Sequence, residues 1–190
     1  MLALYLFSAF NIGQDGDFDQ KQSVLMYNAK LANNLGNLVN RVVVLSLKLD
    51  WVLEWSNENK DEYKKIEIAM IALCKSNMKQ YDLKSSLHSI FALLHSLNKY
   101  VDETEPWSLL KTDEIQAKVV LYNVAEGLRK VWLCLYPFFP EKMSEMFEKL
   151  GLEWYKETLE NGKLEELLHK KETFHIKEKW NNLFERIEVE

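Results

Sequence analysis

The sequence has 190 residues, of which 47% are hydrophobic, 12% aromatic and 28% charged. A chain of this length and composition is not disordered and can bury a sizeable core. Its formal net charge of −5 excludes a general nucleic-acid coat, which would be basic, so any contact with RNA requires a local patch. The three prolines and six glycines are few enough to favour long helices.

The chain opens with the apolar stretch MLALYLFSAF. This stretch lacks a basic n-region and a cleavage site, and it is too short to span a bilayer, so we interpret it as the stump of a structural element. A long helix is predicted from Asp19 to Lys48, because Asp19 and Gln22 form a capping box. Its apolar stripe at helical spacing consists of Leu31, Leu35, Leu38, Val42 and Leu45.

Gly36 lies inside this predicted helix, where glycine costs about 1 kcal/mol relative to alanine. Either another backbone comes close at this position or the helix tolerates the loss. A second helix follows Asn59 and Glu62, which offer another capping box. The apolar face predicted for this second helix consists of Tyr63, Ile66, Met70, Leu73 and Cys74.

A third helix is predicted to begin near Asp82 and to follow a regular 3.6-residue pattern. The apolar residues of that pattern are Leu87, Ile90, Phe91, Leu94, Leu97 and Val101. Pro106 then suits the first turn of a short helix, where its missing N–H costs nothing.

Another long helix is predicted from about Thr112 to Leu135, and Pro140 opens a short helix that reaches Gly151. The buried face of the long helix is predicted to consist of Leu121, Val124, Leu128, Val131 and Leu135. No residue pattern of this chain indicates a strand or an internal repeat.

The last part of the chain, residues 152–190, is divided by Gly162 and includes a short charged helix from Leu164 to Lys170. Apolar residues then recur without a clear period, at Phe174, Ile176, Trp180, Leu183, Phe184 and Ile187. We expect this extended tail to need a partner surface. The predicted fold class is therefore all-α: an antiparallel helix bundle with an irregular C-terminal tail.

The sequence offers no catalytic or metal-binding constellation. Cys74 and Cys134 fall within apolar helical stretches, and we interpret them as reduced core residues of a cytosolic protein. His88 and His95 are two turns apart, with no carboxylate arranged to complete a metal site. The sequence also lacks a glycine-rich phosphate loop and a Ser–His–Asp set, so we predict no catalytic residue and no metal ligand.

The first long helix is unusually rich in asparagine, which is a poor helix former because its amide competes for backbone hydrogen bonds. The polar residues concerned are Asn28, Asn33, Asn34, Asn37, Asn40 and Arg41. Asn37 and Arg41 share a face at i and i+4, where an amide and a guanidinium would read base edges and grip phosphates. The alternative, slightly favoured by composition alone, is that the amides bridge neighbouring helices.

Pro106 and Trp107 place an indole at a rigid helix start. If the indole is exposed, it is a stacking platform for an unstacked base. The alternative is a buried tryptophan that caps the bundle, which is the commoner fate of a tryptophan chosen at random from the six in this chain.

Five segments, taken together and in order, resemble methionyl-tRNA synthetases. The most specific is YNAKLANNLGNLVNR at residues 27–41, which is similar to the first anticodon-domain helix of the bacterial enzymes. It is paired at the right distance with NKYVDETEPW at 98–107. The others are GQDGDF at 13–18, LYPFFP at 135–140 and LFERI at 183–187, which resemble the family's joining segment, the end of its last long helix and its C-terminal peptide.

The resemblance implies a helix bundle of the class I synthetase anticodon-binding type. It also implies roles: Asn37 and Arg41 contact the anticodon, and Trp107 stacks on its first base, a cytosine, in a pose fixed by Pro106. The expected partner is the CAU anticodon loop of methionine tRNA. Residues 1–18 would be the remnant of a junction to a missing catalytic domain, 19–151 the anticodon-binding domain, and 152–190 a C-terminal helix and tail that pack on the bundle or on the absent domain.

The family's catalytic HIGH and KMSKS motifs are absent from this sequence. We therefore expect the parent methionine–tRNA ligase to attach methionine, and this chain to be inactive alone. ATP with magnesium, and zinc where the family has its connective knuckle, would bind in the missing domain, so no cofactor is expected here. The expected location is the cytoplasm, with no membrane or DNA partner. The alternatives are a non-catalytic helix-bundle interaction module and the anticodon domain of a sister class I synthetase.

Overall fold

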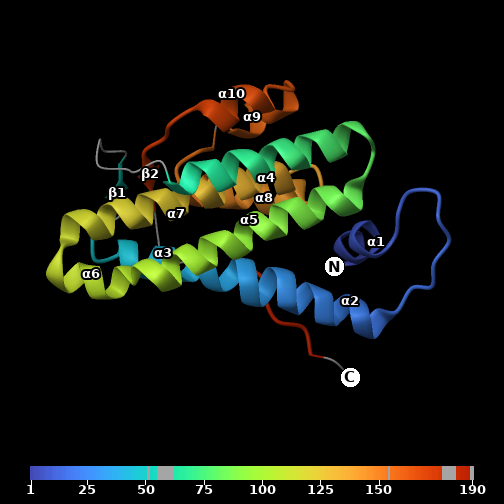
Figure 1. The fold of residues 1–190 in the computed structure, drawn as a ribbon, viewed down its shortest axis with the longest axis horizontal. Coiled ribbons are helices and arrows are strands. Elements are labelled where there is room, and N and C mark those ends of the chain that lie inside the picture. Colours follow the sequence, from blue (N-terminus) through green and yellow to red (C-terminus); the bar gives the residue numbers. More distant parts are fainter. Residues whose placement is uncertain (51, 55–61, 154, 177–182, 189–190) are drawn as a thin grey trace.

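The computed structural model describes residues 1–50, 52–54, 62–153, 155–176 and 183–188, and for residues 62–65 the backbone alone. Helices dominate this part of the chain (Figure 1). The elements in chain order are α1 (Leu2–Ala9), α2 (Gln20–Tyr27), η1 (Asn28–Gly36), α3 (Asn37–Ser46), β1 (Val52–Leu53), α4 (Glu62–Lys79), α5 (Leu83–Thr104), α6 (Pro106–Thr112), α7 (Glu114–Leu135), α8 (Pro140–Lys149), α9 (Tyr155–Glu160), α10 (Leu164–His169) and β2 (Phe174–His175).

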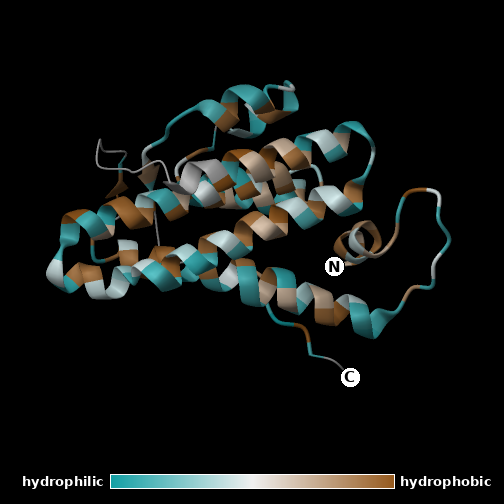
Figure 2. Cartoon of the chain, viewed as in Figure 1, coloured by the Kyte–Doolittle hydropathy of each residue, from teal (hydrophilic) through white to brown (hydrophobic). Residues whose placement is uncertain are grey.

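Helix α7 lies at the centre of the bundle. It packs against α3, α4, α5, α6, α8 and α10, and its predicted apolar face is buried throughout. Helices α4 and α5 form one hairpin, and α6 joins α5 to α7 at the other end (Figure 1). Hydrophilic and hydrophobic residues alternate along the long helices in Figure 2, as expected where each helix covers a core with one side. The predicted all-α bundle is thus confirmed.

The predicted first long helix runs without interruption through α2, η1 and α3. Asp19 caps it, because its carboxylate Oδ1 accepts a hydrogen bond from the Gln22 N–H at 3.0 Å. The middle stretch, η1, is a π-helix, a rare form often found at functional sites. A Cβ added to Gly36 would stand 3.3 Å from the Leu31 carbonyl oxygen, so the backbone that comes close to this glycine is that of its own helix.

The turn from α5 to α6 is set by local chemistry. Asp82 caps α5 by accepting a hydrogen bond from the Ser85 N–H at 2.9 Å. At the other end, Glu105 adopts a left-handed conformation with φ of 44°, which ends α5 and reverses the chain. Pro106 then occupies the first turn of α6, as predicted.

The apolar face predicted for α4 is wrong in part. Ile66 and Leu73 are exposed, whereas Glu67 is buried against Lys130 of α7. The buried carboxylate is acceptable because an opposite charge on another helix satisfies it. The capping residue Asn59 lies outside the described residues, as do the side chains of Glu62 and Tyr63.

Cys74 and Cys134 are both buried and reduced. Their thiols lie within hydrogen-bonding distance across α4 and α7, although 60 positions separate them in the sequence. The neighbouring Cys74 thiol and burial both raise the pKa of Cys134. Cys134 therefore behaves as a neutral core thiol, whereas the contact with Cys134 lowers the pKa of Cys74.

Arg129 of α7 anchors the C-terminal segment. Its fully buried guanidinium donates to the Tyr155 hydroxyl at 3.0 Å and to the carbonyl oxygens of Leu167 at 2.6 Å and Lys170 at 3.0 Å. It also ion-pairs with Glu126 at 2.5 Å. This arrangement compensates the burial of a charge and fixes α9 and α10 on the bundle.

The tail packs on the bundle of this chain. Phe174 and Phe184 are buried, and β2 forms a short antiparallel pair with β1, a strand pairing that the residue pattern did not indicate. Further on, the Asn28 side chain holds the Ile187 backbone from both sides, donating to its carbonyl oxygen at 2.7 Å and accepting from its N–H at 2.9 Å. Trp180 of the predicted tail lies outside the described residues.

Candidate functional site

A seam between the first long helix and α5 organises the candidate site. Three contacts mark it in order: the Lys30 ammonium over the Phe91 ring at 5.2 Å from the centroid, Asn98 Nδ2 donating to Asn34 Oδ1 at 2.6 Å, and Arg41 bound to Asp102 at 2.8 Å. Because the residue numbers rise together on both sides, the two helices run parallel along this seam. Lys30, Asn34 and Arg41 therefore share one face.

Arg41 and Asn37 are both exposed on this face. The Arg41 side chain is 46% exposed and that of its partner Asp102 is 62% exposed, so the ion pair is worth only about 0–1 kcal/mol. The pair orients the guanidinium toward the last turn of α5 without burying it. A stronger anionic partner, such as a phosphate or a base edge, can therefore compete for Arg41.

Trp107 is the second residue of α6, the helix that follows α5, and it is 40% exposed. Pro106 beside it is buried, so the start of α6 is rigid where the indole projects. Trp132, in contrast, is buried in the core. An exposed indole on a rigid helix start is the geometry that the stacking interpretation requires.

The two interpretations of the asparagine-rich helix each hold for different residues. Asn28 and Asn34 bridge to other segments, as the packing alternative predicts. Asn33, Asn37 and Asn40 are exposed, as contact with RNA requires. Together with Arg41 they form the surface that we call the recognition face. Composition could not separate these roles, because identical side chains differ only in what lies opposite them.

The exposed asparagines border a cavity of about 130 Å³ whose other wall is the tail. Phe184 and Arg186 lie in that wall. Arg186 thus adds a guanidinium beside the recognition face. The sequence had marked it only as part of the segment 183–187, which has no clear period.

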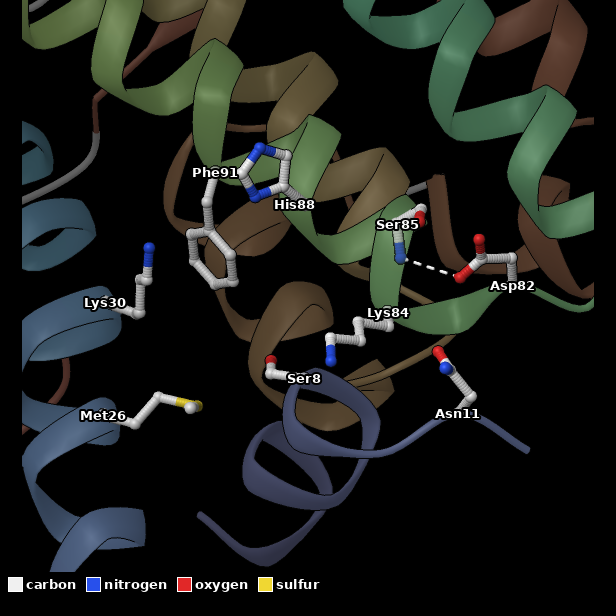
Figure 3. A pocket seen from close by; sticks show the side chains of 9 residues that line it. All are labelled: Ser8, Asn11, Met26, Lys30, Asp82, Lys84, Ser85, His88 and Phe91. Carbon is white, nitrogen blue, oxygen red and sulfur yellow. Dashed lines mark hydrogen bonds between the residues drawn. The ribbon is translucent and has the colours of Figure 1, made fainter. Parts of the chain in front are cut away.

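A larger cavity, of about 550 Å³, opens at the other end of the seam (Figure 3). Ser8 and Asn11 line it from the N-terminal segment, Lys30 from η1, and Lys84 and His88 from α5. Figure 3 shows these side chains around one opening. Sequence reasoning had weighed His88 only as a metal ligand.

Asp82 is the carboxylate among the residues that line this larger cavity. Its capping hydrogen bond from the Ser85 N–H holds its pKa below the ordinary value, so Asp82 remains ionised. Two lysines against one carboxylate leave the cavity positive within a chain of net charge −5.

Nothing in the described part of the chain groups three or more His, Cys, Asp or Glu side chains into a metal-binding cluster. Within the same described residues, the helices are too short or too polar to cross a membrane.

Comparison with known proteins identifies the family. A family model described as the anticodon binding domain of methionyl tRNA ligase matches residues 53–190. The chain belongs to this family. Its membership favours the synthetase interpretation over a helix-bundle interaction module or a sister class I domain.

The family model begins at residue 53, and similarity to individual relatives extends over nearly the whole chain, including the first long helix. The methionine–tRNA ligase of Caldanaerobacter subterraneus is 34% identical over 192 residues, which cover 98% of this chain and 30% of that protein. The Lactococcus lactis enzyme is 36% identical over 163 residues, covering 83% of this chain and 25% of that protein. The chain thus spans about a quarter to a third of the methionine–tRNA ligases it matches.

The fold agrees with the family. Mycobacterium tuberculosis methionyl-tRNA synthetase in its free state superposes with a TM-score of 0.85 at 22% identity, covering 100% of this chain and 39% of that one. The same enzyme in complex with methionyl-adenylate superposes with a TM-score of 0.82. The helical fold therefore agrees with the family that the sequence comparison identifies.

Proposed function

We propose that this chain recognises the CAU anticodon of methionine tRNA as the RNA-binding domain of a methionine–tRNA ligase. The observation that carries the proposal is the exposed indole of Trp107 on a rigid helix start, next to the turn of α5 that holds Arg41, in a chain of the anticodon-binding family. Membership of the family supports tRNA as the ligand, and the exposed side chains supply the contacts.

Each residue has a distinct role in this proposal. Trp107 stacks on the first anticodon base, and Pro106 holds its pose. Asn37 presents an amide to a base edge, and Arg41 presents a guanidinium to a base or phosphate. Stacking contributes about 1–3 kcal/mol per base, and an unpaired polar group penalises a wrong base by a similar amount of about 1–3 kcal/mol. A few such contacts discriminate anticodons without a basic domain.

The parent enzyme supplies the rest of the reaction. In our proposal residues 1–18 form the junction to a catalytic domain, residues 19–151 the anticodon-binding domain, and residues 152–190 the C-terminal helix and tail. The tail packing seen on α7 and η1 supports the last assignment. Methionine, ATP with magnesium, and any zinc bind in the catalytic domain, in the cytoplasm, so this chain alone does not aminoacylate.

Hairpin binding tests the proposal. Fluorescence anisotropy would compare a CAU anticodon stem–loop with one whose first anticodon base is changed. We expect tighter binding of CAU, and Trp107→Ala to weaken it by about 1–3 kcal/mol. Trp107→Phe should retain part of the affinity, because a smaller ring still stacks.

Ile115→Ala is a matched control, because Ile115 is also an exposed apolar residue at a helix start, on α7. This control should bind as the unmodified chain does. Equal affinity for the two hairpins, or no loss on Trp107→Ala, would contradict the proposed function.

A further inference from the structure

The larger cavity, of about 550 Å³, has the size of a ligand site and joins three separate stretches of the chain. The N-terminal segment, the first long helix and the start of α5 meet there, as Figure 3 shows. The anticodon contacts proposed above do not use it. Its lining is therefore a second polar surface, separate from the recognition face.

The positive charge of the residues that line the cavity favours an anion as its ligand. The ammonium groups of Lys30 and Lys84 bring two positive charges, and Asn11 adds an amide donor. The carboxylate of Asp82 is already engaged by the Ser85 N–H, so it does not neutralise both lysines. In Figure 3 Lys30 lies on one side of the opening, and Lys84 lies on the other.

Both lysines are held in place. Lys84 Nζ donates to the Ala9 carbonyl oxygen at 3.2 Å, which ties α5 to the N-terminal segment. Lys30 Nζ sits over the Phe91 ring. An ammonium group has three N–H donors, and the carbonyl contact of Lys84 uses one of them. The contacts therefore position the two charges while leaving donors for an incoming oxyanion.

The cavity lies on the same seam as the recognition residues. Lys30 precedes Arg41 by 11 positions, and both contact α5. At about 1.5 Å per residue this separation is at most roughly 17 Å along the helix. An RNA whose loop reaches Arg41 and Trp107, and whose stem runs back along the first long helix, has stem phosphates at the height of Lys30.

We propose that this cavity binds a backbone phosphate of the anticodon stem, with Lys30 and Lys84 as its cationic partners. The inference rests on the proposed function, because the loop must first be seated at Arg41 and Trp107. A phosphate contact carries no sequence information, so the cavity adds affinity and fixes the direction in which the stem leaves the loop. Trp107 and Asn37 retain the discrimination between anticodons.

The test separates affinity from discrimination. Binding of the CAU hairpin and of the hairpin with a changed first base would be measured over a range of salt concentrations, with the double variant K30Q/K84Q. We expect both hairpins to weaken by the same factor, roughly tenfold. The slope of log K against log salt should shrink by about 1, as for the loss of one phosphate contact.

Two further variants serve as controls. K156Q/K163Q removes the same charge from exposed lysines of the C-terminal segment, which packs on α7 and contributes no residue to the cavity, and should leave the slope unchanged. K30R/K84R keeps both charges and should keep the slope. Thermal unfolding by circular dichroism checks that all variants fold.

The unmodified protein supplies an independent measurement. A hairpin with its stem shortened to two base pairs lacks the phosphates at the height of Lys30. This hairpin should bind the unmodified chain with the lower affinity and shallower salt slope that K30Q/K84Q shows for the full hairpin. The prediction holds even if the double variant does not fold.

The outcomes are distinct. If the slope stays unchanged in K30Q/K84Q and with the short stem, the cavity does not hold an RNA phosphate, and the proposal is overturned. If the lysine variants change anticodon discrimination, the stem assignment is wrong. If Trp107→Ala does not change the affinity for the CAU hairpin, the proposed function fails. The salt slope of K30Q/K84Q still shows whether the cavity contacts a phosphate.

Discussion

Two arginines of this chain lie in opposite settings. Arg129 is fully buried, and its guanidinium binds Glu126, Tyr155 and carbonyl groups of the C-terminal segment. Arg41 is half exposed and holds one exposed partner, Asp102. A buried guanidinium whose donors are engaged is part of the architecture, whereas an exposed one in a weak ion pair is available to a ligand.

Removal of Arg129 is expected to have the largest effect. Arg129→Met would leave the Leu167 carbonyl without its buried donor and the Glu126 carboxylate with Lys130 as its remaining cationic partner, so we expect a loss of about 3–5 kcal/mol in the free energy of unfolding. Urea denaturation followed by circular dichroism would measure it. Arg41→Met is the matched control and should cost less than about 1 kcal/mol. Equal losses for the two variants would remove the contrast between the arginines.

Glu67 tests whether burial also changes the pKa of a charged group elsewhere in the bundle. Burial raises the pKa of the Glu67 carboxyl, against the opposing effect of Lys130. Because the folded-state pKa is raised, folding takes up a proton. The contribution of Glu67 to stability is therefore fully present below its ordinary pKa of 4.5 and is lost as the pH rises through the folded-state value.

Glu67→Gln cannot titrate, so the comparison isolates this contribution. The stability of the unmodified chain relative to Glu67→Gln should fall as the pH rises from 4.5 to the raised pKa. A tenfold change in the acid dissociation constant corresponds to about 1.4 kcal/mol of this fall. Urea denaturation from pH 4 to pH 8 would measure it. A constant difference for Glu67→Gln across this range would contradict the expected direction.

The smallest expected change in stability comes from Arg41→Gln, with a large change in binding. The free energy of unfolding should move by less than about 1 kcal/mol, whereas affinity for the CAU hairpin should drop by about 1–3 kcal/mol. Arg41→Lys should recover part of that affinity, because it restores the charge but not the planar fork. Unfolding and anisotropy measurements on the same preparations would show the separation, and a parallel loss in both would indicate a structural role.

The helix boundaries were the most predictable feature. Asp19 caps the helix it was expected to cap, the third helix begins next to Asp82 as predicted, and Pro106 begins a helix where its missing N–H costs nothing. These signals lie within three or four residues of the group they satisfy, so a single sequence contains both partners. The apolar pattern of α5 was likewise correct in full.

The candidate site was only partly predictable. The resemblance singled out Asn37, Arg41 and Trp107, and the structure exposes all three. Their roles in binding stay predictions. The charged cavity at Lys30 and Lys84 had no signal in the sequence, because its lining comes from three stretches that no periodicity connects.

The sequence by itself determined that this chain is a helix bundle of the methionyl-tRNA ligase anticodon-binding family, because caps, apolar periods and family segments are local or ordered along the chain. Only the tertiary structure decided which of two identical side chains packs and which faces solvent. Asn28 holds Ile187, 159 positions away, while Asn37 is exposed. Burial depends on what lies opposite a residue in space, and distant segments supply it.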